Sequence, residues 1–279
     1  MAYKSLISFV TSETGLDSFL DAAVAMAERS DAHLEICCLA VDSTQAIGFF
    51  AGAPAVIYQD SLEQLQTQAE TLRETVRARL NGRPLRWSTE DAVVPMGAIG
   101  SYVGLKSRFS DLVLLPCPYE SGRGPQDELV TEAALFDGSA AVLVLPKDMK
   151  TLPEFERVVL AWNQSEEALH AARAAMPLLI AADLVNLVVI DPPAHGQERS
   201  DPGGLLTTMM ARHGVKAEVS VIASGGQDVA QTLQRHALDK NASLLVMGAY
   251  SHSRLRQAIL GGTTRSLLAQ SATPIFMMH

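Results

Sequence analysis

A glycine-containing segment late in the chain, residues 242–264, carries the residue types best suited to binding an anion. An apolar run, Leu244 to Met247, ends at Gly248 and predicts a buried strand. A polar loop follows, and Gly261-Gly262-Thr263-Thr264 then opens a predicted helix. Glycines let a backbone approach a phosphate closely, while helix N-terminal amides and threonine hydroxyls donate hydrogen bonds to it. The segment therefore predicts a phosphate site.

The spacing of this segment resembles the ATP-binding signature of the universal stress protein family. That signature is a glycine, two residues, a second glycine, nine residues, a third glycine and then Ser or Thr. Gly248, Ser251, Gly261 and Gly262 occupy its four fixed positions. Gly248 and Gly261 match the first and third glycines, whereas Ser251 replaces the second glycine and Gly262 replaces the Ser or Thr. Thr263 follows at once and supplies a hydroxyl. The alternative is that Gly248 and Gly261 are turn glycines without a ligand.

The resemblance implies further site residues. In the family an Asp after the first strand holds the adenine, and here Asn163 stands there, able to donate and accept hydrogen bonds. Asn163 or Ser165 could instead cap the next helix, which is the expected sole role of Ser165. Val189 matches a position that packs on adenine, with an ordinary core role equally open. Arg254 is the preferred phosphate contact because a guanidinium pairs with phosphate as a fork. The predicted nucleotide-binding set is Asn163, Val189, Met247, Gly248, Ser251, Arg254, Gly261, Gly262, Thr263 and Thr264.

The first half of the chain lacks a matching glycine loop. Pro116 and Pro118 stand where amide donors are needed, and proline has no amide hydrogen. Residues 122–124, Gly-Arg-Gly, offer a residual anion contact, but the turn at residues 11–14 supplies no Asp or Asn. Acidic side chains nearby would repel an anion: Glu120, Asp127 and Glu128. We therefore predict that this half is a degenerate, non-binding partner domain.

Both halves share one α/β plan, which must position these residues. Each opens with a strand, an amphipathic helix and a second strand: residues 4–10, 16–29 and 33–39, then 157–161, 165–181 and 184–190. Continuous apolar strands alternating with helices indicate parallel sheets covered on both faces. We expect an α/β fold of two tandem doubly wound parallel-sheet domains, residues 1–146 and 155–279, with a linker at 147–154. One continuous doubly wound sheet is the alternative.

Two further segments bear on the assembly of the halves. Residues 43–61 include a run too apolar for an ordinary solvated loop, which predicts a lid, an interface flap or simple packing on its own core. The last strand of each half, residues 141–145 and 274–278, is expected to pair with the other. This pairing would make an intramolecular pseudo-dimer, and a homodimer is the alternative.

The amino-acid composition of the chain argues against some classes of function. The chain has 279 residues, 48% of them hydrophobic, and a formal net charge of −9, which argues against nucleic-acid binding. No run of about 18 apolar residues appears, so no membrane span is expected. The three cysteines have neither a metal spacing nor a disulfide pattern, which favours a reducing, cytoplasmic location.

The resemblance implies a stress-response protein whose C-terminal half binds ATP or a related adenine nucleotide, with or without Mg²⁺, and responds to it through an unknown protein partner. No Walker lysine follows the glycines and no nucleophile elbow is present, so a binding module is favoured over an enzyme, with weak ATP hydrolysis at most. The alternative is a structural or signalling scaffold of the same fold that binds no nucleotide.

Overall fold

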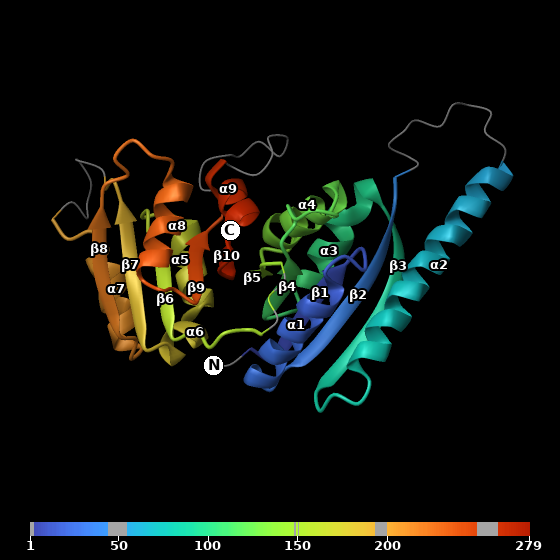
Figure 1. Ribbon diagram of the computed structural model, residues 1–279, viewed down its shortest axis with the longest axis horizontal. Helices are drawn as coiled ribbons and strands as arrows, with labels where there is room; N and C mark the ends of the chain where they lie inside the picture. The colour runs from blue at the N-terminus through green and yellow to red at the C-terminus, as the bar shows by residue number, and fades with distance from the viewer. Residues whose placement is uncertain (1–2, 44–54, 148, 150, 193–199, 250–261) are drawn as a thin grey trace. The chain divides into compact units, whose positions relative to one another are not determined.

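The computed structural model describes residues 3–43, 55–147, 149, 151–192, 200–249 and 262–279. These residues form two compact units. The N-terminal unit comprises residues up to 140 together with 147–152, and the C-terminal unit comprises residues 141–146 and 153–279. Both are α/β units built on a mostly parallel sheet, as the sequence predicts (Figure 1).

The N-terminal unit has a parallel sheet in the order β3-β2-β1-β4. Its strands are rich in apolar residues, and β1 and β4 are almost wholly buried, as expected of strands with both faces covered. The bounds are β1 Ser5–Val10, β2 His33–Asp42, β3 Arg86–Pro95 and β4 Leu112–Pro116.

Helices cover this sheet. Helix α1 buries one apolar stripe, which includes Leu16, Phe19, Leu20 and Met26, and ends where Asp31 adopts a left-handed conformation. Helix α2 packs on β2 and β3, and α3 packs on a π-helical turn at Ala133–Asp137. The helix bounds are α1 Leu16–Ser30, α2 Ala55–Leu80, α3 Ile99–Ser107 and α4 Pro125–Glu132, with a 3-10 turn at Met96–Ala98.

The C-terminal unit has a five-stranded parallel sheet in the order β10-β9-β6-β7-β8. Helix α5 packs on β9 and β10, and α7 packs on β8. The strand bounds are β6 Arg157–Ala161, β7 Leu184–Ile190, β8 Ala217–Ile222, β9 Leu244–Gly248 and β10 Ile275–Met278. The helix bounds are α5 Glu166–Ala174, α6 Met176–Ala181, α7 Gly204–Arg212, α8 Val229–Asp239 and α9 Gly262–Gln270.

A sixth strand, β5 Val142–Leu145, completes this sheet from the first half of the sequence. It pairs antiparallel with β10, and Leu143 lies opposite Phe276. The predicted pairing of these two strands is confirmed. Both are almost entirely buried, so each covers an apolar edge of the other.

Two sequence-based expectations need correction. The helix predicted over residues 165–181 is two helices, α5 and α6, that meet at Ala175. Pro177 explains the break, because it has no amide hydrogen for a bond one turn back. The second part of the segment 43–61 is the start of the long helix α2, whereas residues 44–54 lie outside the described chain. None of the described helices combines the length and the apolar character that a bilayer crossing needs.

Candidate functional site

The predicted site lies at the carboxyl ends of β6 and β9 in the C-terminal unit. The chain leaves β6 for β7 on one side, and later returns to the other side of β6 as β9. The strand order therefore reverses next to β6, and such switch points leave a crevice in which α/β sheets bind ligands. Asn163 follows β6, and Gly248 ends β9.

Asn163 is exposed and belongs to a local turn after β6. Its side-chain oxygen accepts a hydrogen bond from the backbone amide of Ser165 at 3.2 Å. Ser165 in turn caps α5, because its hydroxyl accepts from the amide of Ala168 at 3.1 Å. The predicted capping role of Ser165 is thus confirmed.

Val189 and Met247 are core residues. Val189 in β7 is 2% exposed and Met247 in β9 is 6% exposed. Both belong to strands that are buried along nearly their whole length, which favours the ordinary packing role for each. A ligand at this edge would touch at most their outermost atoms.

Gly248 has a packing reason to be glycine. A Cβ at this position would lie 2.5 Å from the backbone nitrogen of Ala168 and 2.7 Å from the carbonyl carbon of Glu167. Strand β9 can therefore approach the first turn of α5 this closely only without a side chain at residue 248. This contact accounts for Gly248 without any ligand.

Gly262 differs from Gly248 in this respect. It is exposed, begins α9, and a Cβ there would meet nothing within 4 Å. The first turn of α9, within residues 262–279, carries no acidic residue, so no side chain of that turn offsets the positive end of the helix dipole. Thr263 is half-buried and Thr264 is buried. Ser251, Arg254 and Gly261 lie outside the described residues.

The corresponding position of the N-terminal unit is filled by the chain's own side chains. At the end of β1, the hydroxyl of Thr11 donates to Asp127 at 2.8 Å. The other carboxylate oxygen of Asp127 accepts from the backbone amide of Gly124, at the start of α4. The guanidinium of Arg123, 2% exposed, lies 3.3 Å from Asp127 and donates to the carbonyl of Thr14 at 2.8 Å.

A carboxylate thus holds the place at the α4 N-terminus that an anion would need. Arg123 is already committed to Asp127 and Thr14, so the residual anion contact expected of residues 122–124 is not free. The sequence reasoning missed this cluster, because Thr11 and Asp127 are 116 positions apart. That this half binds no nucleotide stays a prediction.

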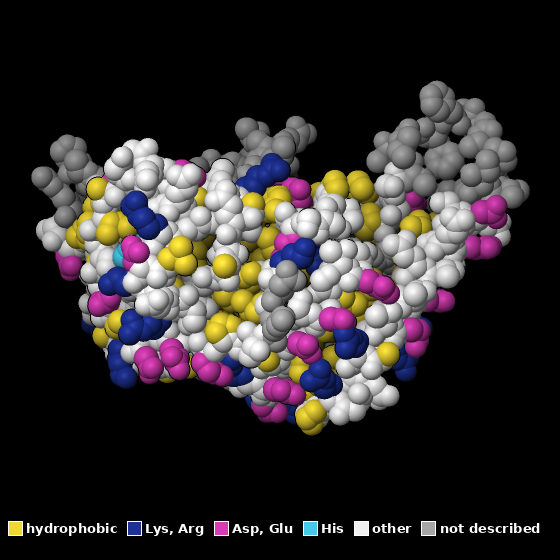
Figure 2. Space-filling view, viewed as in Figure 1, with side chains coloured by type: hydrophobic (Ala, Val, Ile, Leu, Met, Phe, Trp, Pro, Cys, Tyr) yellow, Lys and Arg dark blue, Asp and Glu magenta, His cyan; other side chains and the backbone are white. Residues whose placement is uncertain are grey.

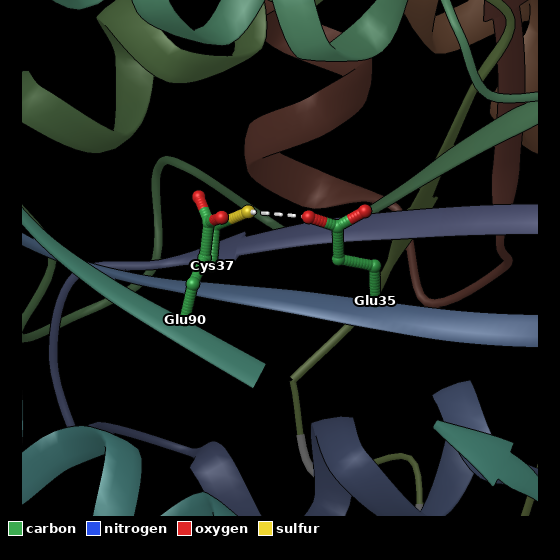
Figure 3. A group of neighbouring side chains, drawn as sticks. All are labelled: Glu35, Cys37 and Glu90. Carbon is green, nitrogen blue, oxygen red and sulfur yellow. Dashed lines mark hydrogen bonds between the residues drawn. The ribbon is translucent and has the colours of Figure 1, made fainter. Parts of the chain in front are cut away.

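A second group of potential ligands lies between β2 and β3, where Glu35, Cys37 and Glu90 come together (Figure 3). Among the described residues this is the group whose atoms are close enough to share a metal ion. A cation already fills it, since the ammonium of Lys106 from α3 lies 2.9 Å from Glu35 and 2.8 Å from Glu90. Tyr102 also donates to Glu90.

The chemistry of this group follows from its burial and its ion pairs. Burial, with the nearby charge of Glu90, raises the pKa of the Cys37 thiol far above its ordinary value. Burial would also raise the pKa of Glu90, but hydrogen bonds from Lys106 and Tyr102 outweigh it and lower that pKa. The Glu90 carboxylate is therefore ionised, both carboxylates are paired with Lys106, and the thiol stays protonated. The group ties α3 to the sheet and offers neither a nucleophile nor an open metal site.

Comparison with known proteins agrees with this architecture. Residues 154–279 match the model of the universal stress protein family. A universal stress protein from Synechocystis is 26% identical over 139 residues, and the match covers 48% of this chain and 45% of that protein. The chain thus spans less than half the length of this curated relative.

Solved structures extend the likeness over both units. A universal stress protein from Archaeoglobus fulgidus has a TM-score of 0.73 at 14% identity, covering 98% of this chain and 96% of that one. A putative universal stress protein from Pseudomonas aeruginosa UCBPP-PA14 has a TM-score of 0.57 at 16% identity, covering 99% and 93%. At these identities the likeness concerns the fold, which is the tandem α/β architecture. Residues 154–279 therefore belong to the universal stress protein family, and the chain as a whole shares its tandem fold with solved proteins of that family.

Proposed function

We propose that the C-terminal unit binds an adenine nucleotide at the carboxyl ends of β6 and β9, and that the protein is a nucleotide-responsive binding module. The observation that supports this most is the first turn of α9, which follows β9 beyond the switch point. Gly262 leaves its backbone accessible, no acidic residue stands in the first turn, and Thr263 and Thr264 add hydroxyls. These groups fit a phosphate.

The proposal concerns binding and not turnover. No lysine follows the glycines as in a Walker sequence, so the chain lacks that cation for the transferred phosphate. A Mg²⁺ ion would arrive with the nucleotide, coordinated mainly by phosphate oxygens and water. We also propose a cytoplasmic location, which is supported by three free and buried cysteines.

A second candidate function is a scaffold of the same fold that binds no nucleotide. Two observations favour it: Gly248 is explained by its packing on α5, and the Asn163 oxygen is engaged in its own turn. The two proposals differ in whether the N-terminus of α9 ever receives a phosphate.

Calorimetry with ATP, ADP and AMP on the full chain separates them. We expect affinities that are micromolar or weaker in the wild type, and Gly262→Val to weaken binding at least tenfold, because a branched side chain obstructs the backbone. Gly97→Val is the matched control, since a Cβ at Gly97 also meets nothing within 4 Å. Circular dichroism checks that both variants fold. Absence of heat and of a thermal shift at millimolar nucleotide would instead support the scaffold.

A further inference from the structure

A pocket lies at the opposite end of the C-terminal sheet, where β6, β7 and β8 begin. Its volume is about 240 Å³. Arg157, Asn186, Glu218 and Lys240 supply its polar lining, and Val159 and Leu184 are among its apolar walls. In Figure 2 the lower margin of this unit, below the starts of these strands in Figure 1, carries side chains of both charges.

The strand register places the polar groups on one face of the sheet. Arg157 pairs with Leu184, Val159 with Asn186, and Asn186 with Glu218. Adjacent residues of parallel strands point to the same side, so these five side chains share a face. Asn186 is 2% exposed and interrupts an otherwise apolar strand, Leu184–Ile190. A buried amide is costly unless it is hydrogen-bonded, and packing alone would favour an apolar residue there.

The hydrogen bonds of Asn186 are complete. Its amide nitrogen donates to Glu218 at 2.7 Å and to Ser220 at 2.9 Å. Its oxygen must therefore accept from Nε2 of His236 in α8, at 2.7 Å, which fixes the tautomer of a neutral His236. Lys240 donates to the same oxygen of Glu218 at 2.9 Å. The floor of the pocket is thus a connected network that holds Glu218 and Lys240 in place.

Arg157 is the cation of this pocket outside the hydrogen-bonded network, although its charge acts on Glu218 and helps to lower the pKa of that carboxyl. Its backbone bonds to Ser243, but among the described residues its guanidinium makes no hydrogen bond or ion pair. Glu218 is paired with Lys240. The polar lining therefore carries one positive charge in excess, which lies beside the apolar walls Val159 and Leu184. A ligand with one negative charge and a short apolar part would complement both the positive charge and the apolar walls.

We propose that this pocket binds a small organic monocarboxylate. The carboxylate pairs with Arg157 in a two-pronged contact and receives a further hydrogen bond from Lys240, and its alkyl part lies on Val159 and Leu184. The volume lies below the roughly 300–1,000 Å³ of pockets that bind drug-sized ligands, so we infer that the ligand is a small metabolite.

This site is separate from the proposed nucleotide site. The pocket uses the first residues of β6 and β7, whereas Asn163 follows the last residue of β6 and Gly248 is the last residue of β9. A strand of seven residues spans roughly 23 Å, at about 3.3 Å per residue. The two sites can therefore be occupied together, and failure of one says nothing about the other.

The experiment is an NMR titration of the full ¹⁵N-labelled chain with sodium butyrate, sodium acetate and, at matched ionic strength, sodium chloride. We expect saturable shifts of the backbone amides of Leu184, Lys240 and Ala242 with a millimolar Kd for butyrate. Butyrate should bind about tenfold more tightly than acetate, because two more methylene groups reach the apolar wall. ATP at saturating concentration should leave the butyrate affinity unchanged.

Arg157→Gln should weaken butyrate binding at least tenfold. Arg212→Gln is the matched control, because Arg212 is also exposed and lies on α7 outside the pocket lining. Its butyrate affinity should equal that of the wild type. Shifts that do not saturate, shifts reproduced by chloride, or equal affinity in the folded Arg157→Gln variant would each overturn the proposal.

Discussion

At the scale of single residues, the two halves of the chain differ at the N-terminus of the helix that precedes the last strand of each half. In the N-terminal unit the amide of Gly124, at the start of α4, and the hydroxyl of Thr11 both donate to Asp127. In the C-terminal unit the first turn of α9 carries no acidic side chain. A carboxylate supplied by the chain thus stands in one unit where we propose that a phosphate is bound in the other.

The variant Asp127→Ala tests how much this carboxylate contributes to the stability of the fold. Arg123 would remain buried and keep only Glu120, 3.7 Å away, as an ionic partner, so we expect the free energy of unfolding to fall by about 2 kcal/mol. Thr11→Val removes one hydrogen bond from the same carboxylate and should cost about 1 kcal/mol. Urea unfolding measures both. Equal, small losses in the two variants would show that Arg123 does not depend on Asp127.

The lowered pKa of His236 leads us to predict how the stability of the protein depends on pH. Burial, together with the charge of Lys240, lowers its pKa below the ordinary 6.5, whereas Asp239 and Glu218 act weakly in the opposite sense. Below that ordinary value the unfolded chain takes up a proton that the folded chain binds less readily, so stability falls as the pH falls. Well above it His236 is neutral in both states and contributes no such dependence.

His236→Gln should therefore lose less stability than the wild type between about pH 7.5 and pH 5. Glutamine keeps a donor for the oxygen of Asn186 but does not titrate in this range. Urea unfolding at the two pH values gives the comparison, and all other titrating groups are common to both proteins. Parallel losses in the two proteins would contradict the assigned role of His236.

At the scale of elements, regular patterns were predictable and irregular ones were not. Strands β6 and β7 have the bounds that their apolar runs predicted, 157–161 and 184–190. The prediction of one helix over residues 165–181 was wrong. The helical spacing of apolar residues continues across Pro177, but the backbone hydrogen bonds of the helix are interrupted there. Helix α2, over Ala55–Leu80, was not predicted, because its first turns belong to the apolar segment that we interpreted as a lid, an interface flap or packing on its own core.

Within the candidate site, the sequence predicted only contacts between residues that are close together in the chain. The cap at Ser165 depends on residues three positions apart, so the sequence pattern indicates it. The packing of Gly248 on Ala168 depends on residues eighty positions apart, and a glycine in a sequence does not reveal which backbone approaches it. For the same reason the sequence did not reveal that Arg157 and Asn186 line one pocket.

The two site glycines should respond differently to a methyl group. Gly248→Ala places a Cβ against the backbone of α5, so we expect it to cost about 2 kcal/mol of stability through overpacking. Gly262→Ala has open space around it and should change stability by less than about 0.5 kcal/mol. Urea unfolding decides between these outcomes. A neutral Gly248→Ala would mean that β9 and α5 separate at little cost.

At the scale of the whole molecule, one strand crosses the division between the halves of the sequence. Strand β5 belongs to the C-terminal unit although it is encoded before the segment that joins the halves. We propose that this pairing makes the chain an intramolecular pseudo-dimer, with a homodimer as the alternative. The domain division at residues 1–146, 147–154 and 155–279 stays a prediction, and it would separate β5 from its partner.

Two fragments test what β5 contributes. Residues 153–279 lack β5 and leave the apolar edge of β10 uncovered, so we expect this fragment to dimerise or aggregate. Residues 141–279 retain β5 and should self-associate less at the same concentration. Sedimentation velocity compares them. A soluble, folded monomer of residues 153–279 would show that β10 needs no such cover.

The position of β5 also has a consequence for synthesis on the ribosome. Its partner β10 is made about 130 residues later, which at roughly 5–20 residues per second is a delay on the order of ten seconds. Throughout that delay an apolar strand, Val142–Leu145, has no β10 to cover it and is a target for chaperones or for a neighbouring nascent chain. Slower translation of the intervening segment should therefore lower the yield of folded protein, even though every residue of the product is unchanged.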